Sequence, residues 1–313
     1  MRFDGFVIPV SLVVLLGGVA LDLLLGEPPE SLHPVVWIGR AIKVLKERFE
    51  GFGRKRFFGG ILVLLVVIGA GGAGYLAVKF SSGWWWPLGL GVGIYLLKST
   101  LSIRSLIETV WTIGRSIEKT PEDARDKLLA LVGRDRSNLS PGEMRSAAIE
   151  SLFENLVDSI VSPLFYFFLG SFINFEAGVA MALGFKALNT VDSMVGYRTE
   201  KLLDLGCPGA RLDDILNWIP ARLSPFLISV GSLSFAPLRM AFRDWDNTPS
   251  PDSGWSMGAS SGALKIKLKK RSHYVIGSEF DLPGSEDIAR ATWLAGRTVL
   301  IYLLCLSGAI IFI

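Results

Sequence analysis

The sequence predicts an all-α, polytopic integral membrane protein with amphipathic and re-entrant helices and cytoplasmic loops. Half of the 313 residues are hydrophobic and only 19% are charged, whereas a soluble domain carries about 25% charged residues. The hydrophobic residues fall in blocks, several of which approach or exceed the ~20 apolar residues that cross a bilayer. We expect one membrane domain over residues 1–313, with spans near 6–25, 57–80, 84–103, 155–175, 177–195, 219–238 and 293–313.

Basic residues predict the orientation of these spans. Seven Lys and Arg residues lie between the first two blocks, essentially Lys79 alone lies between the second and third, and a further basic cluster follows the third. The positive-inside rule then places the N-terminus outside and the loops 26–56, 104–150 and 239–290 in the cytoplasm. The net charge of +3 is too small to indicate nucleic-acid binding. The two cysteines are far apart, so no disulfide framework or zinc spacing is expected.

The first block is expected to stay in place as a span, because GEPPESLHP follows it instead of a small-residue cleavage site. Asp22, near its end, either reaches toward the interface or belongs to a site, and the sequence leaves both open. His33 precedes a proline and is expected to be a turn residue. Apolar and charged residues then alternate with a helical period over 35–52, which predicts an amphipathic helix on the inner membrane surface.

Several further segments are best explained by structural roles. The glycine-rich run 69–74 lies inside an apolar block without a preceding strand or a lysine, so close helix packing explains it better than nucleotide binding. The run Trp84 to Trp86 is typical of an interfacial aromatic belt. Thr120-Pro121 and Ser140-Pro141 predict helix starts. Alternating residues in 263–270 and 273–277 predict a short hairpin. Residues 226–238 are interpreted as a re-entrant or paired segment, because a full crossing would leave a basic segment outside.

An acidic ladder is predicted on the helix that runs from Arg145 to Tyr166. Glu150, Glu154 and Asp158 follow one another at four-residue spacing, which places them on one face of an α-helix. Stacked carboxylates at a membrane boundary repel one another and are costly to desolvate. Oxygen ligands of this kind suit Mg²⁺, which shares itself with water and substrate phosphates.

Two more polar clusters adjoin apolar runs. Lys186, Asn189 and Ser193 share a helical face with Thr190, and Asp192 and Tyr197 lie close by in sequence. In the second cluster, acidic and amide groups stand at positions 213, 214 and 217; alone, it is equally well explained by acids in the first turn of a helix. The loop 133–143 is either a solvated connector or a phosphate-binding segment that uses its arginines.

Seven segments carry recognisable motifs in order: DLLLGEPPESLHPVVWIGR at 22–40, GRDRSNLS at 133–140, AAIESLFENLVDSIVSPLFY at 147–166, KALNTVDSMVGYRTE at 186–200, ARLDDILNWIPARL at 210–223, SPDSGWSMGASSGAL at 250–264 and HYVIG at 273–277. Together they resemble the adenosylcobinamide-phosphate synthase family, the integral-membrane CobD/CbiB proteins of cobalamin biosynthesis. Three positions depart from the family pattern, which usually has asparagine where Asp252 stands, proline where Ser256 stands and threonine where Arg136 stands.

The resemblance implies an ATP- and Mg²⁺-dependent carbon–nitrogen ligase. Its substrates would be an adenosylated corrinoid, adenosylcobyric acid, and (R)-1-amino-2-propanol O-phosphate, which is joined to the free propionate carboxylate to give adenosylcobinamide phosphate. No GxxxxGK[ST] motif occurs, so ATP must be held in another way. We expect the active site to face the cytoplasm from the cytoplasmic membrane, in contact with membrane lipid and in reach of other late cobalamin-assembly enzymes.

We assign roles to individual residues on this basis. The expected catalytic residues are Asp192, Lys186, Asn189 and Glu154, with Asp192 as candidate base for the ammonium of the aminoalcohol. The expected metal ligands are Glu150, Glu154, Asp158, Asp213 and Asp214. The expected substrate and phosphate contacts are Arg134, Asp135, Ser193, Tyr197, Arg198, Asn217, Arg222, Asp252 and Trp255, together with Lys186.

Two alternatives stay open. A Mg²⁺-dependent intramembrane prenyl- or CDP-alcohol-type transferase also uses acidic residues at four-residue spacing, although such enzymes carry tighter DxxxD repeats and less polar loop. A corrinoid-binding or transport protein would place polar half-helix ends at mid-membrane. No inverted repeat is visible and the polar clusters lie at span ends, which argues against transport.

Overall fold

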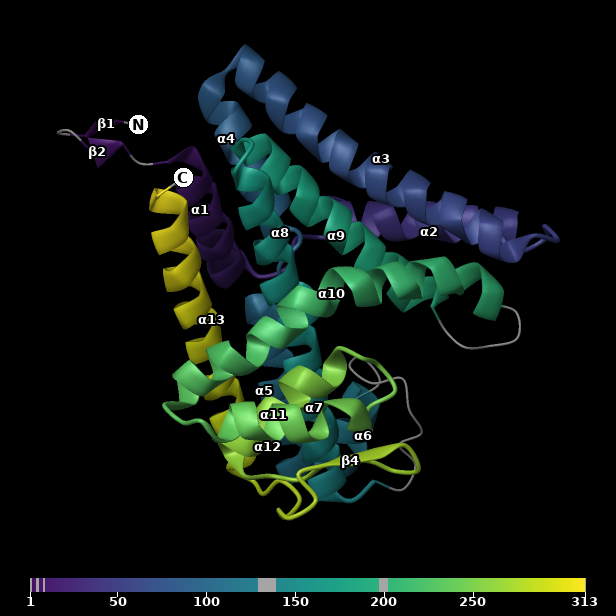
Figure 1. Ribbon diagram of the computed structural model, residues 1–313, viewed down its shortest axis with the longest axis vertical. Coiled ribbons are helices and arrows are strands. Elements are labelled where there is room, and N and C mark those ends of the chain that lie inside the picture. Colours follow the sequence, from purple (N-terminus) through teal and green to yellow (C-terminus); the bar gives the residue numbers. More distant parts are fainter. Residues whose placement is uncertain (1, 4–5, 8, 129–138, 197–201, 313) are drawn as a thin grey trace. The chain divides into compact units, whose positions relative to one another are not determined.

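The computed structural model describes residues 2–3, 6–7, 9–128, 139–196 and 202–312, and helices dominate it (Figure 1). The all-α prediction is therefore confirmed. The first half contains β1 (Arg2–Phe3), β2 (Phe6–Val7), α1 (Val10–Leu25), α2 (Pro34–Phe49), α3 (Lys55–Trp84), α4 (Trp86–Lys98), α5 (Ile103–Lys119) and α6 (Pro121–Lys127). The second half contains α7 (Pro141–Leu156), η2 (Val157–Val161), α8 (Ser162–Ser171), α9 (Phe175–Val195), α10 (Leu203–Ser232), α11 (Ala236–Asp244), η3 (Trp245–Asn247), α12 (Ser253–Leu264), β3 (Leu268–Lys270), β4 (Tyr274–Ile276) and α13 (Asp287–Ile311).

Four helical stretches in the described part of the chain are long and apolar enough to cross a membrane: Lys55–Trp84, Trp86–Lys119, Pro141–Ser171 and Asp287–Ile311. They coincide with four of the predicted spans, although three of them extend well beyond the predicted bounds. The first predicted span is a shorter apolar helix, α1, of 16 residues. Helix α9 covers the predicted span 177–195, whereas α10 ends at Ser232 inside the predicted span 219–238 and α11 begins at Ala236. Both α9 and α10 carry charged residues along their length. Whether these three also cross the membrane stays a prediction.

The chain divides into two compact units that are each assembled from separate stretches of sequence. Unit 1 comprises Met1–Ile103, Asp158–Asn217 and Cys305–Ile313, and unit 2 comprises Arg104–Val157 and Trp218–Leu304. In unit 1, helix α9 packs against α3 and α8, and α2 and α4 each contact α3 and α9. The core of this unit is aliphatic and includes Ile42, Leu62, Val63, Val66, Ala187, Leu188, Val191, Val195, Leu202 and Leu205.

Small residues let helices α3 and α9 approach closely. A Cβ atom at Gly71 would lie 3.0 Å from the carbonyl oxygen of Ala180, and one at Gly74 would collide with the side chain of Leu183. The interpretation of this run as a packing surface is therefore confirmed at Gly71 and Gly74, whereas Gly69 and Gly72 have open space beside them. Trp84 and Trp85 at the end of α3 are 85% and 62% exposed, as an interfacial belt requires.

Unit 2 is organised around α7 and α12. Helix α7 contacts strand β3 and helix α12, and α12 in turn packs against α11. The predicted helix start at Ser140 is confirmed, since the Ser140 hydroxyl accepts from the N–H of Glu143 while the Glu143 side chain accepts from the N–H of Ser140. The predicted hairpin is also confirmed, because β3 and β4 pair antiparallel with Leu268 opposite Ile276.

A substitution pair on α3 tests the close helix contact in unit 1. A Cβ atom at Gly59 would collide with the backbone carbonyl oxygen of Leu205, whereas one at Gly60 would meet nothing within 4 Å. We expect Gly59→Ala to destabilise the protein by about 1–3 kcal/mol, because the helices must move apart. Gly60→Ala should leave stability unchanged or raise it slightly, since alanine favours helix. Thermal unfolding of the two variants in the same detergent measures the difference; equal stability would contradict the contact.

Candidate functional site

A chain of buried polar side chains in unit 1 joins α8 to α10. The Ser162 hydroxyl donates to Oδ1 of Asn217 (2.6 Å), and Nδ2 of Asn217 donates to Oδ2 of Asp213 (2.9 Å). Asp213 and Asn217 are four residues apart on α10, so both point to the same side of that helix. The Tyr166 hydroxyl donates to the backbone carbonyl of Leu216 (2.9 Å) and fixes the two helices nearby. The predicted pair Asp213 and Asn217 thus forms one buried cluster.

Helix α9 contributes the cationic and amide groups of the same unit. The Lys186 Nζ donates to the hydroxyl of Ser159 (2.9 Å), which lies in η2 beside Asp158. Asn189 is buried one turn further along, and it hydrogen-bonds the carboxyl group of Asp213. Four of the predicted site residues, from three different helical segments, therefore adjoin one another in unit 1: Asp158, Lys186, Asn189 and Asp213. Their sequence separation explains why no single motif contains them.

The surroundings of Asp213 are unfavourable to a negative charge. Burial raises the pKa of Asp213 to about 8, and the nearby carboxylates of Asp158 and Asp192 act in the same direction, against hydrogen bonds from Asn217 and Asn189. Its Oδ1 atom is buried without a hydrogen-bond partner in the described part of the chain. An orphaned carboxylate oxygen among other carboxylates is a donor set that fits a small hard cation.

The fit to Mg²⁺ is partial. Among the described residues, no group of three or more His, Cys, Asp or Glu side chains has the arrangement of a closed metal site. A Mg²⁺ ion near Asp213 would therefore take its remaining ligands from water and from substrate phosphates, which is how this ion is usually bound. The metal roles of Glu150, Glu154, Asp158, Asp213 and Asp214 stay predictions.

The predicted acidic ladder needs a geometric correction. The structure interrupts the α-helix with a π-helical segment at Val157–Val161, so regular four-residue spacing holds for Glu150 and Glu154 but not onward to Asp158. Glu150 is buried in unit 2, where its carboxylate accepts from the hydroxyls of Ser146 (2.6 Å) and Tyr274 (2.7 Å). These bonds explain the burial of Glu150 as support for the β3–β4 hairpin. Glu154 is exposed.

A second cluster of predicted site residues lies in unit 2. Nη1 of Arg222 donates to Oδ1 of Asp252 (3.1 Å). The guanidinium carbon lies 4.9 Å from the ring centroid of Trp255 and 4.4 Å from that of Trp218. The indole Nε1 of Trp255 is buried and has no hydrogen-bond partner among the described residues. Arg222, Asp252 and Trp255 are thus brought together, with an aromatic surface that an extended planar ligand could cover.

Sequence reasoning left one buried ionic network largely unassigned. Asp22 is 1% exposed, accepts from the backbone N–H of Ile103 (2.9 Å) and lies 3.6 Å from Nζ of Lys98. That ammonium group lies equally far from Oε2 of Glu27, which also contacts Nε2 of His33 (3.0 Å). The sequence signal for this network was a charged residue, Asp22, inside an apolar block. Its partner Lys98 lies 76 positions away, and hydrophobic periodicity does not identify a partner at that distance.

The remaining predicted residues are less constrained. Ser193 is exposed, and its hydroxyl donates to the carbonyl of Asn189 (2.8 Å). Asp192 and Asp214 are half-buried in α9 and α10 of unit 1. The structure does not test their chemical roles. Four predicted contacts lie outside the described residues: Arg134, Asp135, Tyr197 and Arg198.

Comparisons with known proteins agree with the motifs. The family model described as CobD/Cbib protein matches residues 15–295. The chain is 43% identical over 306 residues to a probable cobalamin biosynthesis protein CobD of Methanothrix thermoacetophila, covering 94% of this chain and 95% of the relative. It is 36% identical to the cobalamin biosynthesis protein CbiB of Salmonella typhimurium, covering 86% and 85% of the two chains. No solved structure matches.

The ionic network of unit 1 yields a stability prediction. Asp22→Asn keeps a hydrogen-bond acceptor for Ile103 but removes one of the two carboxylates beside buried Lys98. We expect a loss of about 3–5 kcal/mol, because a buried charge loses a partner. The double variant Asp22→Asn with Lys98→Met should recover part of that loss. Denaturant unfolding of both variants provides the measurement, and a loss below about 1 kcal/mol in the single variant would contradict the pairing.

Proposed function

We propose that this chain, which belongs to the CobD/CbiB family and acts in cobalamin biosynthesis, forms an amide bond with the help of ATP. The substrates would be adenosylcobyric acid and (R)-1-amino-2-propanol O-phosphate, and the product adenosylcobinamide phosphate. One observation supports this chemistry most directly. A half-buried lysine, Lys186, adjoins carboxylates and amides contributed by η2, α9 and α10 in unit 1.

The reaction needs an activated carboxyl group, because a carboxylate is a poor acyl donor. In the proposed first step, an oxygen of the propionate carboxylate attacks the γ-phosphorus of ATP, and ADP leaves. In the second step, the amine nitrogen attacks the acyl carbon, the carbon–oxygen bond to phosphate breaks, and inorganic phosphate leaves. The amine must first give up a proton, for which Asp192 is the candidate base.

Lys186 would hold phosphate oxygens during both steps. Its ammonium group is directed at Ser159 on η2, at a place where apolar surroundings strengthen electrostatic contacts. Asn189 and Asn217 keep the carboxyl group of Asp213 in position by hydrogen bonds. Mg²⁺, when bound by Asp213 and its neighbours, would neutralise phosphate charge.

The second cluster would serve recognition of the corrinoid. Arg222 sits over the Trp218 and Trp255 rings, and Trp218 is 55% exposed, so an aromatic face is open to a flat ligand. We propose that the cytoplasmic side of the cell membrane carries this surface, in keeping with the basic loops and the four helices of membrane-spanning length. Other late enzymes of cobalamin assembly are proposed partners on that side.

The decisive assay uses purified protein in detergent with adenosylcobyric acid, aminopropanol phosphate, ATP and Mg²⁺, followed by mass spectrometry of the corrinoid. Formation of adenosylcobinamide phosphate together with ADP and phosphate is expected. Corrinoid binding without any turnover would favour a scaffold. Transfer of label into a lipid extract would favour an intramembrane transferase.

Two adjacent carboxylates offer a matched comparison in that assay. Asp213 is buried within the unit 1 cluster, whereas its neighbour Asp214 is half-buried. We expect Asp213→Asn to lower kcat by about 10²-fold or more, the loss typical of a removed electrostatic contact in a reaction centre. Asp214→Asn should lower it far less. The amide preserves size, so both variants are expected to fold, and unfolding temperatures check this.

The exposed acid of the ladder needs its own test. Glu154→Gln should reduce turnover and raise the Mg²⁺ concentration at half-maximal rate if Glu154 reaches the metal from α7. Full turnover with an unchanged Mg²⁺ dependence would remove Glu154 from the proposed site and leave the unit 1 carboxylates as the metal ligands.

A further inference from the structure

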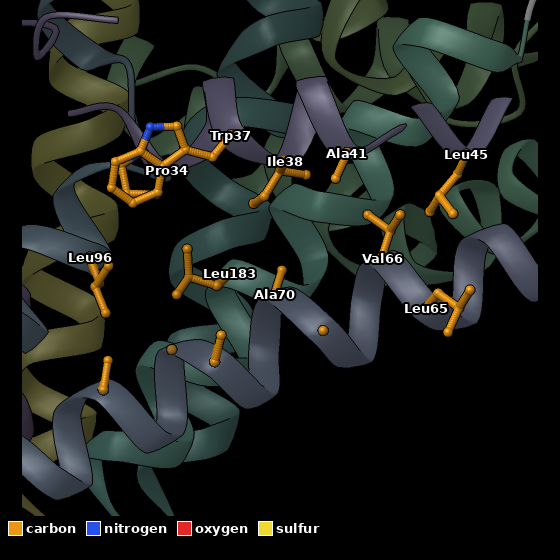
Figure 2. A pocket seen from close by; sticks show the side chains of 14 residues that line it. Pro34, Trp37, Ile38, Ala41, Leu45, Leu65, Val66, Ala70, Leu96 and Leu183 are labelled. Atoms are coloured by element: carbon orange, nitrogen blue, oxygen red, sulfur yellow. The ribbon is translucent and has the colours of Figure 1, made fainter. Parts of the chain in front are cut away.

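An apolar groove lies between helices α2 and α3 of unit 1, separate from the polar clusters described above. It has a volume of about 400 Å³, and every residue that lines it is uncharged (Figure 2). Figure 2 shows side chains of α2, among them Ile38 and Leu45, facing side chains of α3, among them Val66 and Ala70, across the opening. Leu96 and Leu183 complete the lining. We call this the α2–α3 groove.

The length of the groove matches one half of a bilayer. Its α3 wall extends from Leu65 to Ala77, which at 1.5 Å per residue is about 18 Å. One leaflet of the hydrocarbon core is about 15 Å thick, and α3 is one of the four helices long and apolar enough to cross a membrane. The wall consists largely of Gly and Ala, so the space that larger side chains would fill is left open.

Lining chemistry excludes a polar occupant. The one polar group on the lining side chains, the indole N–H of Trp37, donates to the backbone carbonyl of Ser31 (3.0 Å) and is therefore already satisfied. A corrinoid with its amide side chains would find no side-chain donor or acceptor there. A hydrocarbon chain needs none, and its burial is favoured by about 0.8 kcal/mol per CH₂ group.

The positive charge of the segment beside the groove favours a lipid with an anionic headgroup. Residues 34–56 carry seven Lys or Arg against two Glu. On α2, Arg48 lies on the groove-facing side, at offsets of seven and eleven residues from the lining residues Ala41 and Trp37. Arg48 is exposed and forms no ion pair with any described residue. Arg48 lies three residues beyond the groove-lining Leu45, so its cation favours an anionic headgroup over a zwitterionic one.

We propose that the α2–α3 groove binds one acyl chain of an anionic phospholipid, whose phosphate pairs with Arg48. The lipid would link the amphipathic helix α2 to the spanning helix α3. By contacting both helices, it would hold α2 and the turn before it, which contains the Glu27–His33 contact, against α3. This inference does not depend on the proposed enzymatic reaction.

Two pairs of variants test the groove and the headgroup contact separately. Gly69 lines the groove and Gly72 does not, and a Cβ atom at either position would meet nothing within 4 Å. Gly69→Leu therefore fills the groove, and Gly72→Leu is its matched control on the same helix. Arg48→Glu reverses a charge on the groove side of α2, and Lys43→Glu makes the same charge change on a different face.

The purified proteins are incubated with vesicles of phosphatidylglycerol or of phosphatidylcholine, re-isolated in mild detergent, and analysed for phospholipid per chain by mass spectrometry. We expect the wild type, Gly72→Leu and Lys43→Glu to retain phosphatidylglycerol in preference to phosphatidylcholine. Gly69→Leu should reduce retained phosphatidylglycerol by roughly tenfold, which corresponds to about 1.4 kcal/mol. Arg48→Glu should abolish the preference between the two lipids.

Equal retention by Gly69→Leu and Gly72→Leu would overturn the groove as the binding place. Equal retention of the two lipids by the wild type would overturn the headgroup contact. If Gly69→Leu does not fold, the Arg48→Glu and Lys43→Glu pair still decides the proposal, because both substitutions are on exposed positions. If two chains associated through the groove, the wild type would show an oligomeric mass that falls to the monomer mass in Gly69→Leu, with no change in lipid content. That result would also overturn the proposal.

Discussion

The arrangement of unit 1 depends on one constraint: its buried charged groups must have partners of opposite charge. An ion removed from water costs several kcal/mol unless partners surround it, and a whole domain is stable by only about 5–15 kcal/mol. Asp22, Lys98 and Glu27 meet this requirement jointly, and they connect the end of α1, the end of α4 and the turn before α2. The backbone of Ile103 adds a fourth element. Helix ends that are far apart in sequence are therefore held together by charge in a largely apolar unit.

The same requirement distinguishes the two clusters of candidate site residues. In unit 1, the Oδ1 atom of Asp213 lacks a hydrogen-bond partner among the described residues, which leaves it available to a cation. In unit 2, Arg222 is already compensated by Asp252 and by two indole rings. A phosphate that approached Arg222 would have to compete with that carboxylate. The first cluster thus suits charge stabilisation, and the second suits recognition of a flat ligand.

Local patterns predicted the parts of the fold that local physics determines. The apolar run of α3, the helix start at Ser140 and the hairpin around His273 each depend on residues close in sequence. The partners of Asp22 and Asp213 depend on tertiary contacts between distant segments, which a single sequence does not encode as a period. The π-helical segment after Leu156 also escaped prediction, because four-residue spacing alone assumes an unbroken α-helix.

The histidine at the start of α2 has a consequence for metal selectivity. Nδ1 of His33 accepts from the backbone N–H of Val35 (3.2 Å), so the ring proton resides on Nε2, which faces Glu27. Both nitrogens are engaged, and the second histidine of the chain, His273, belongs to unit 2. Within unit 1, a cation beside Asp213 would thus meet carboxylate, amide and hydroxyl oxygens without competition from an imidazole lone pair. Such surroundings discriminate against zinc, copper and nickel in favour of alkaline-earth ions.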